Sequence, residues 1–311
     1  MAIMYNIGID VGGTSIKGGI VSLDGKIIYK SVCKIVNEKA ITALDCVTEK
    51  LVLYAKTNRI EINGAGIGVP CIFDKKTGVV SYGNNLDFGG VNLKEYFSNK
   101  YGLSLEIAND AAVAALGEYK FGGAKGYENS VLITIGTGVG CGIILGGKII
   151  NSNSSAVGEL SHTTIEMHGR KCSCGKQGCV EAYCSMTALY KDLRREMFLN
   201  RNSLLWDKIN PDDIDGKAFF EFLGKDKTAD KVFNRFIKYL SVAVTNVANL
   251  LRPDIILIGG GVSAQGQTLI KPLNEYLENN IFAKEFTEKI PVIASKNGND
   301  AGILGASALL S

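Results

Sequence analysis

The hydrophobic positions of this chain occur mainly as short apolar runs that end in glycine-rich turns. The run Ile7–Asp10 is followed by the turn Val11–Ser15 and by a second apolar run over residues 16–21. The same arrangement returns over residues 132–144. Short β-branched runs bounded by glycine are typical of strands. We therefore predict two strand–turn–strand units, whose similarity indicates an internal duplication and two related lobes.

Longer segments with helical patterns lie between and after these units. The alanine-rich run Asp110–Glu118 predicts a helix with Asn109 or Asp110 as its N-cap. Residues 230–251 form an amphipathic segment, 253–262 read as a buried strand and a glycine turn, and 298–310 predict a terminal helix. This alternation indicates an α/β fold, with a lobe boundary near residue 115.

Composition and charge narrow the functional classes. The chain has 311 residues, of which 46% are hydrophobic, so it can bury a sizeable core and form two domains. Its 34 basic and 31 acidic side chains are mixed along the chain and leave a net charge of +3, which argues against nucleic acid or a membrane as partner. With no apolar run near the roughly 18 residues of a membrane span and no secretory leader, we expect a cytoplasmic protein.

One part of the sequence has the residue types of a zinc site. His162, Cys172, Cys174 and Cys179 can fill a tetrahedral coordination shell. His168 is an alternative fourth ligand, and we favour His162 because Glu159 precedes it by three residues. Because Glu159 and Glu181 flank the cluster, the metal is expected to hold a ligand-binding loop in place. The other cysteines are expected to be buried free thiols: Cys33, Cys46, Cys71, Cys141 and Cys184.

The glycine turns are candidates for nucleotide binding. Turns of this kind expose backbone N–H groups that suit a phosphate, and Thr14 and Thr137 occupy matching places in the two copies. A third turn, Gly259–Gly261, follows a fully apolar strand and would let an adenine ring approach the backbone. A dinucleotide-binding fold is not expected, because residues 16–21 read as strand where that fold needs a helix.

The Asn109–Asp110 pair lies where a carboxylate that activates a hydroxyl can meet a phosphate, although capping alone would explain either residue. Taken together, the motifs resemble the ROK family of sugar kinases and sugar-responsive repressors. The resemblance rests on Asp10-x-Gly12-Gly13-Thr14-x-x-Lys17, Asn109-Asp110, Gly136-Thr137-Gly138-x-Gly140, Gly158-Glu159-x-x-His162 and Cys172-x-Cys174-Gly175-x-x-Gly178-Cys179-x-Glu181.

The resemblance implies an actin-like, ribonuclease H-like fold of two lobes with the active-site cleft between them. The smaller lobe is expected at residues 1–115, with the helix at 298–311 packing back on it, and the larger lobe at 116–297 with the zinc loop. ATP and a sugar are the implied partners, and the family often forms homodimers.

The resemblance also assigns roles to residues. Asp110 is the expected catalytic base. The expected sugar ligands are Asn85, Asn109, Asp110, Glu159, His162 and Glu181. The expected residues for ATP and Mg²⁺ are Asp10, Gly12, Gly13, Thr14, Lys17, Gly136, Thr137, Gly138, Gly259, Gly260 and Gly261. The expected ligands of a structural Zn²⁺ are His162, Cys172, Cys174 and Cys179.

We therefore expect an ATP-dependent kinase that phosphorylates the 6-hydroxyl of a hexose, with glucose as the first choice. A kinase for N-acetylmannosamine, another amino sugar or fructose is the alternative. A sugar-sensing regulator without its own DNA-binding domain is a second alternative. The turn Asn85–Phe88 departs from the usual glucokinase pattern, in which Asn-Leu is followed by a small residue and tryptophan, and this leaves the exact sugar open.

Overall fold

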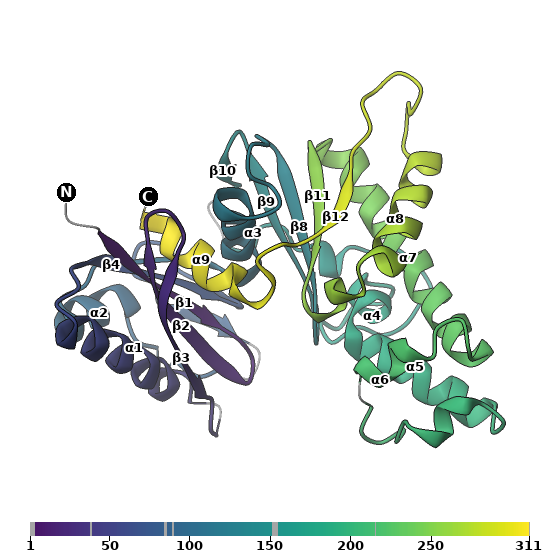
Figure 1. Ribbon diagram of the computed structural model, residues 1–311, viewed down its shortest axis with the longest axis horizontal. Helices are drawn as coiled ribbons and strands as arrows, with labels where there is room; N and C mark the ends of the chain where they lie inside the picture. Colours follow the sequence, from purple (N-terminus) through teal and green to yellow (C-terminus); the bar gives the residue numbers. More distant parts are fainter. Residues whose placement is uncertain are drawn as a thin grey trace. The chain divides into compact units, whose positions relative to one another are not determined.

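The structure is a computed structural model that describes residues 4–37, 39–83, 86–88, 90–150, 155–214 and 216–310. Its strands and helices form two five-stranded sheets and one two-stranded sheet with flanking helices (Figure 1). This confirms the expected α/β class. Asn85, one of the expected sugar ligands, lies outside the described residues. Within them, no helix has both the length and the hydropathy that a bilayer crossing requires.

The first sheet is built from the N-terminal third of the chain and has the order β3-β2-β1-β4-β7. Its strands are β1 (Tyr5–Val11), β2 (Ser15–Ser22), β3 (Ile27–Lys34), β4 (Ile62–Val69) and β7 (Leu105–Asn109). β1, β2 and β3 pair antiparallel, whereas β1, β4 and β7 run parallel. Parallel neighbours need crossover connections. These contain α1 (Ala40–Thr57), β5 (Cys71–Phe73), β6 (Val80–Gly83) and α2 (Leu93–Tyr101).

Adjacent glycines on β2 show which helix covers each face of this sheet. A Cβ on Gly18 would lie 2.6 Å from a methyl of Val47 in α1, and one on Gly19 would lie 2.9 Å from a methyl of Ile303. Ile303 belongs to α9 (Ala301–Ser307) near the C-terminus. Because successive strand residues point to opposite faces, α1 and α9 cover opposite sides of the sheet.

The helix α3 (Asp110–Phe121) packs directly against α9 (Figure 1); α3 also contacts β4 and β7, and α9 contacts β1, β2 and β4. A Cβ on Gly305 of α9 would come within 1.5 Å of the Val113 carbonyl oxygen of α3. Only glycine permits so close an approach of two helix backbones. The C-terminal segment thereby joins the core that the N-terminal strands begin.

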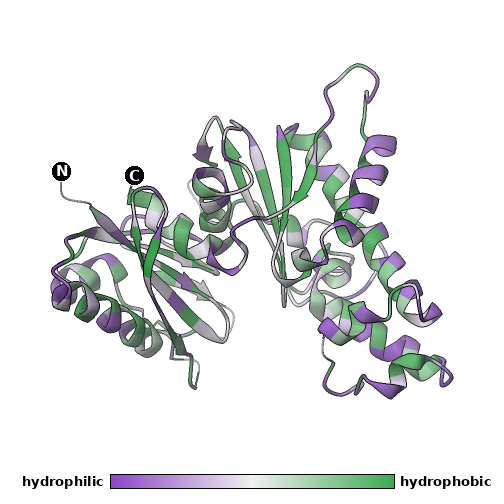
Figure 2. Cartoon of the chain, viewed as in Figure 1, coloured by the Kyte–Doolittle hydropathy of each residue, from purple (hydrophilic) through white to green (hydrophobic). Residues whose placement is uncertain are grey.

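The second sheet repeats the strand order of the first. Its order is β10-β9-β8-β11-β12. The strands are β8 (Ser130–Ile135), β9 (Val139–Leu145), β10 (Lys148–Ile149), β11 (Ile255–Gly259) and β12 (Val292–Ala294). In each sheet the third, second, first, fourth and fifth strands follow one another across the sheet, which confirms the predicted duplication. β11 is buried and apolar along its length (Figure 2), as its sequence predicts.

The connection between β10 and β11 carries the metal-binding motif and most of the remaining helices. These are α4 (Glu181–Cys184), α5 (Met186–Leu199), α6 (Gly216–Glu221) and α7 (Lys227–Leu251), while α8 (Gln267–Asn280) follows β11. α7 begins three residues before the predicted amphipathic segment, because the Asp226 side chain caps it by accepting from the N–H groups of Thr228 and Ala229.

The chain divides into two compact units. Unit 1 contains Met1–Leu132, Cys141–Gly158 and Ser295–Ser311, and unit 2 contains Ile133–Gly140 and Glu159–Ala294. The division at Leu132 lies later than the lobe boundary expected near residue 115. The reason is that α3 packs against α9 and the first sheet, which keeps the whole helix in unit 1.

A buried carboxylate anchors the segment where the chain re-enters unit 1. Glu118 of α3 is fully buried. It accepts hydrogen bonds from the backbone N–H groups of Gly123 (2.7 Å), Lys296 (3.1 Å) and Asn297 (2.7 Å). A buried charge is tolerated when hydrogen bonds replace its hydration. Glu118 therefore ties α3 to the residues that lead into α9.

One expectation about the cysteines was wrong. Cys33 of β3 and Cys46 of α1 form a disulfide instead of lying apart as free thiols, whereas Cys71, Cys141 and Cys184 are buried free thiols as expected. The packing of α1 against β3 brings the Cα atoms of Cys33 and Cys46 to 6.2 Å, within the range that a disulfide spans. Sequence spacing alone carries no signal for this pairing.

Candidate active site and metal centre

The parallel strands of the first sheet bring two predicted functional carboxylates to one edge. Asp10 of β1 is in register with Gly68 of β4, and Gly68 is in register with Ala108 of β7. Asp110 follows β7 directly as the first residue of α3. Asp10 and Asp110 therefore both lie at the carboxyl ends of parallel strands, on either side of β4. This edge is the usual ligand-binding position of open α/β sheets.

The start of α3 separates the roles of Asn109 and Asp110. Asn109 is the N-cap, and its side-chain oxygen accepts from the N–H groups of Ala111 (2.9 Å) and Ala112 (3.2 Å). Asp110 also accepts from the N–H of Ala111 at 2.9 Å. Since Asn109 already satisfies the helix end, capping alone does not require a carboxylate at position 110.

The surroundings of Asp110 include a second ionisable group. Burial raises the pKa of the Cys71 thiol to about 12, with a further contribution from the Asp110 charge. Cys71 begins β5, two residues after Val69, which is in register with Asn109. A thiol that stays protonated at neutral pH therefore lies near the Asp110 carboxyl group.

The first glycine turn connects β1 to β2 and places a cation opposite Asp10. The N–H of Gly12 donates to the Ser15 carbonyl (3.0 Å), and the N–H of Ile35 donates to the Thr14 carbonyl (2.9 Å). Lys17 is the cross-strand partner of Asp10. Burial raises the pKa of Asp10 above its ordinary value, and the Lys17 charge opposes this effect. Gly13 and Thr14 at the tip of the turn are exposed.

The second glycine turn connects β8 to β9 and is held by the α4–α5 region. The N–H of Met186 donates to the Gly136 carbonyl (2.9 Å), and the Thr187 hydroxyl donates to the Thr137 carbonyl (2.7 Å). The N–H of Val139 donates to Oε2 of Glu181 at 3.3 Å. These contacts fix the carbonyl groups of the turn, while Gly136 and Thr137 stay exposed.

The third glycine turn lies directly against the second. A Cβ on Gly260 would come within 2.1 Å of the Ile135 carbonyl oxygen, immediately before Gly136. Gly260 also has a positive φ of 83°, so a glycine is required twice over. The structure thus brings together Gly136–Gly138 and Gly259–Gly261, two of the three turns expected to bind the nucleotide.

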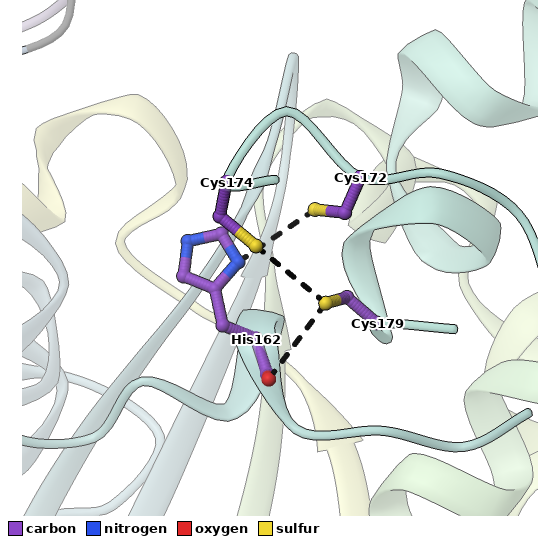
Figure 3. Close-up of side chains that lie close together, drawn as sticks. All are labelled: His162, Cys172, Cys174 and Cys179. Carbon is purple, nitrogen blue, oxygen red and sulfur yellow. Dashed lines mark hydrogen bonds between the residues drawn. The ribbon is translucent and has the colours of Figure 1, made fainter. Parts of the chain in front are cut away.

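The predicted metal ligands converge in unit 2 (Figure 3). One donor atom from each of His162, Cys172, Cys174 and Cys179 lies within 4.8 Å of all the others. Nδ1 of His162 lies 3.8 Å from the Cys172 sulfur, and the Cys174 and Cys179 sulfurs are 3.7 Å apart. The cluster contains His162 and not His168, which confirms the preference expressed from the sequence.

The local backbone explains how widely spaced residues form this cluster. The N–H of Cys172 donates to the Lys176 carbonyl (2.8 Å) and closes a turn that contains Gly175 with a φ of 88°. Gly178 has a φ of 76°, and a Cβ there would come within 1.8 Å of the Glu166 carbonyl oxygen. The two glycines of the Cys-x-Cys-Gly-x-x-Gly-Cys pattern therefore shape the loop that presents the thiols.

The distances fit a tetrahedral zinc ion. Zn–S bonds of about 2.3 Å in tetrahedral geometry separate the ligand atoms by about 3.8 Å. The observed sulfur–sulfur and sulfur–nitrogen separations of 3.7 and 3.8 Å agree with this value. Because Nδ1 of His162 faces the sulfurs, its Nε2 is directed away from the cluster and remains available to a ligand (Figure 3).

The two glutamates that flank the cluster differ in their contacts. Glu159 is exposed and precedes the short 3₁₀ turn Leu160–His162, in which the His162 N–H donates to the Glu159 carbonyl at 3.1 Å. Glu181 is half-buried at the start of α4 and accepts from the Ser173 hydroxyl at 3.1 Å as well as from Val139. Both residues therefore lie beside the metal cluster, as expected.

Several residues that position the site have no recognisable sequence signal. Nη2 of Arg170, two residues before Cys172, donates to both carboxylate oxygens of the buried Asp192 of α5, at 2.9 Å each. Its backbone N–H donates to the Tyr183 hydroxyl oxygen (2.7 Å), and its guanidinium lies over the Tyr183 ring. Arg170, Ser173 and Thr187 were not singled out from the sequence. Their hydrogen-bond partners are not adjacent in the sequence, so no local pattern marks them.

Comparisons with known proteins find relatives over nearly the whole chain. The pattern of the ROK family matches residues 6–311. The glucokinase of Thermotoga maritima is 32% identical over 307 residues, covering 98% of this chain and 96% of that protein. The xylose repressor of Bacillus subtilis is 27% identical over 309 residues, covering 98% of this chain and 77% of that protein.

The structural comparison gives the same result. The crystal structure of a ROK family glucokinase from Streptomyces griseus, in complex with glucose and AMPPNP, superposes with a TM-score of 0.85. The two sequences are 30% identical, and the match covers 98% of each chain. This similarity confirms the expected fold, that of actin-like ATPases.

Proposed function

Because this chain belongs to the ROK family, we propose that it is an ATP-dependent sugar kinase that transfers the γ-phosphate of ATP to the 6-hydroxyl of glucose. The observation that carries the proposal is the register of β1, β4 and β7, which brings Asp10 and Asp110 to one sheet edge. It is supported by the similarity to the Streptomyces griseus glucokinase that was crystallised with glucose and AMPPNP.

Asp110 is the proposed general base. A sugar hydroxyl is a weak nucleophile at neutral pH, so a carboxylate must accept its proton as the phosphoryl group arrives. Asp110 is held at the start of α3 by its hydrogen bond to the N–H of Ala111, while Asn109 provides the cap. The rigid helix start fixes where the carboxylate can meet a hydroxyl.

Asp10 is the proposed carboxylate for Mg²⁺, in contact with the metal through water. Burial raises the pKa of Asp10, because the charged carboxylate has lost part of its hydration. A cation bound nearby would stabilise the charged form and would itself be attracted strongly. The turn Gly12–Thr14 beside it is proposed for the transferring phosphates, together with Lys17. The turns Gly136–Gly138 and Gly259–Gly261 are proposed for the rest of the nucleotide, because they lie against one another and expose backbone.

The metal cluster is the proposed support of the sugar site. When bound, Zn²⁺ would supply a rigid tetrahedral anchor and perform no step of the transfer. His162 would use Nδ1 as a metal ligand and Nε2 for a sugar hydroxyl, so metal binding also fixes the imidazole orientation. The remaining proposed sugar ligands are Asn85, Asn109, Glu159 and Glu181.

The proposal is tested by measuring ADP release from ATP in the presence of about ten hexoses and amino sugars. Glucose should give the highest kcat/KM and exceed N-acetylmannosamine at least about tenfold, because a site that pairs each hydroxyl strongly rejects altered sugars. Mass spectrometry and NMR of the product should identify the 6-phosphate. 6-Deoxyglucose should bind without turnover.

The outcomes separate the alternatives. A preference for N-acetylmannosamine, another amino sugar or fructose would assign the chain to that substrate. Tight sugar binding without ADP release for any sugar would favour a sensor that lacks catalysis. The expected homodimer is a separate prediction, which light scattering of the purified protein would test.

A further inference from the structure

The Glu181 carboxylate joins two parts of unit 2 that have different proposed tasks. Its Oε1 accepts from the Ser173 hydroxyl at 3.1 Å, and its Oε2 accepts from the Val139 N–H at 3.3 Å. Ser173 lies between two metal ligands, Cys172 and Cys174. Val139 follows the glycine turn Gly136–Gly138. One side chain therefore connects the metal loop to the turn.

The contact with the turn depends on a small residue beside it. A Cβ on Gly138 would come within 2.6 Å of Oε2 of Glu181. Position 138 can thus carry no side chain while Glu181 keeps its place. The absence of a side chain at Gly138 therefore lets the Glu181 carboxylate come close to the turn. It would equally let a phosphate come close to the backbone there.

The contact with the metal loop depends on the Ser173 hydroxyl. This hydroxyl has one hydrogen to donate, and the Glu181 oxygen at 3.1 Å is nearer than the Cys172 sulfur at 3.9 Å. The positions of Cys172 and Cys174 on either side are set once both thiolates bind a metal. The backbone of Ser173 is then fixed from both ends, and so is the direction in which its hydroxyl points.

We propose that Ser173 is a positioning residue that orients Glu181, and that Glu181 transmits the order of the metal loop to the glycine turn at Val139. This proposal rests on the proposed function, because it makes the metal loop support the turn proposed for the nucleotide as well as the residues proposed for the sugar. A carboxylate has about four acceptor positions. Among the residues that the structure describes, Glu181 accepts two hydrogen bonds, which leaves acceptor positions for a sugar hydroxyl.

The first test removes only the hydroxyl. Ser173→Ala should retain about one zinc per chain, since all four ligands remain, but should raise the glucose Kd and KM about tenfold, as expected for the loss of a hydrogen bond to a charged group. The KM for ATP should rise about two- to threefold, and kcat should change less than about twofold. Ser173→Thr keeps the hydroxyl and should restore the glucose Kd, the glucose KM and the KM for ATP.

The control is Lys171→Ala, which removes an exposed side chain from the same loop and should leave zinc content and both KM values unchanged. Zinc is measured by mass spectrometry, and the glucose Kd by calorimetry. Loss of zinc from Ser173→Ala, or an unchanged glucose Kd in it, would overturn the positioning role.

The second test asks whether Ser173 acts through Glu181. In a double-mutant cycle, Ser173→Ala should cost about tenfold in glucose kcat/KM in the wild-type background and almost nothing in the Glu181→Ala background. Equal losses in both backgrounds would mean that the serine acts by another route. Glu181→Ala should also raise the KM for ATP, whereas Glu159→Ala should raise only that for glucose. An unchanged KM for ATP in Glu181→Ala would contradict the link to the turn.

These results are distinguishable from failure of the proposed function. If the wild-type protein phosphorylates no sugar, the proposed function fails, and the calorimetric Kd values still decide whether Ser173 orients Glu181. If the wild-type protein phosphorylates glucose but the cycle is additive, only the positioning role fails.

Discussion

The two five-stranded sheets have the same strand order but carry different chemistry. In the first sheet, carboxylates lie at the carboxyl ends of the parallel strands: Asp10 lies opposite Lys17, and Asp110 begins the helix after β7. In the second sheet, the corresponding turn Gly136–Gly138 offers backbone groups, and side chains from the α4–α5 region hold it from outside. The two sheets therefore share their strand order, whereas the side chains at the corresponding turns differ.

From this difference we predict that the two units contribute to different steps of the proposed reaction. The carboxylates of unit 1 are suited to moving a proton and holding a cation, so their loss should reduce turnover. The metal cluster and glutamates of unit 2 are suited to orienting a ligand, so their loss should weaken binding. Four variants follow, ordered from the largest expected effect to the smallest: the first two test this comparison of turnover with binding, and the last two compare the interactions that stabilise each unit.

The largest effect is expected for Asp110→Asn. The amide cannot accept the hydroxyl proton, so kcat should fall by about 10² to 10⁴, while the glucose Kd changes only a few-fold. Steady-state kinetics and calorimetry measure the two quantities. Circular dichroism should show an unchanged fold, because Asn109 remains as the cap. Turnover close to wild type in the folded variant would remove Asp110 from catalysis.

The matched change in unit 2 is Cys174→Ser. The variant should lose zinc, since a closed structural site needs its four ligands, and the glucose KM should rise by about 10² as the loop that carries Glu159 and Glu181 loosens. The effect on the KM for ATP should be smaller. Cys184→Ala, which changes a buried thiol outside the cluster, should retain zinc. Sugar kinetics that survive zinc loss would show that the cluster is not needed for binding.

The third prediction concerns the stability of unit 1. Glu118→Gln replaces one acceptor oxygen with an amide N–H that faces backbone donors, so the free energy of unfolding should fall by about 2–4 kcal/mol. Urea denaturation measures this change. Glu106→Gln, on an exposed side chain, should change it by less than about 0.5 kcal/mol. Equal stability of the two variants would mean that the three hydrogen bonds of Glu118 do not anchor the segment.

The fourth prediction concerns a charged network in unit 2, in which Arg235 contacts both Glu196 and Asp192, the partner of Arg170 beside the metal loop. Glu196 of α5 is buried, which opposes its ionisation, but hydrogen bonds from Lys231, Arg195 and Arg235 dominate and hold its pKa near 2, below the ordinary 4.5. The lowered pKa means that the ionised form stabilises the fold above pH 4.5. This contribution is lost as the pH falls from about 4.5 toward 2.

Glu196→Gln should therefore lower the melting temperature by a few degrees at pH 7, about 1–3 kcal/mol for a buried group that loses charged partners. The difference from wild type should shrink below pH 4.5. Thermal unfolding at pH 7, 5 and 3.5 measures it. A difference that is constant over this range would show that the charge of Glu196 contributes nothing.

Local patterns in the sequence predicted most of the elements. The strands around both glycine turns, the buried strand Ile255–Gly259 and the helix that begins at Asp110 follow from hydrophobic runs, glycine positions and a capping residue. These signals act over a few residues and are therefore readable without a partner. The spacing of Cys172, Cys174 and Cys179 belongs to the same class, because the loop that gathers them is short.

Contacts between distant segments were not readable in this way. The disulfide between Cys33 and Cys46 requires α1 to lie on β3, and the division at Leu132 follows from α3 packing against the C-terminal helix α9. The choice between Asn109 and Asp110 as N-cap depended on the backbone dihedrals at the end of β7. Each of these features depends on tertiary packing, which brings together residues whose spacing in the sequence gives no sign of the contact.

The sequence by itself determined the family, the strand and turn pattern and the chemical types of the site, because the Asp, Gly, Cys and His positions are set by local turns and by ligand chemistry. Only the tertiary structure decided that Asp10 and Asp110 share one sheet edge and that Glu181 reaches both Ser173 and Val139. The physical reason is that strand register and side-chain reach are set by the packing of the whole unit, in which many weak contacts act together.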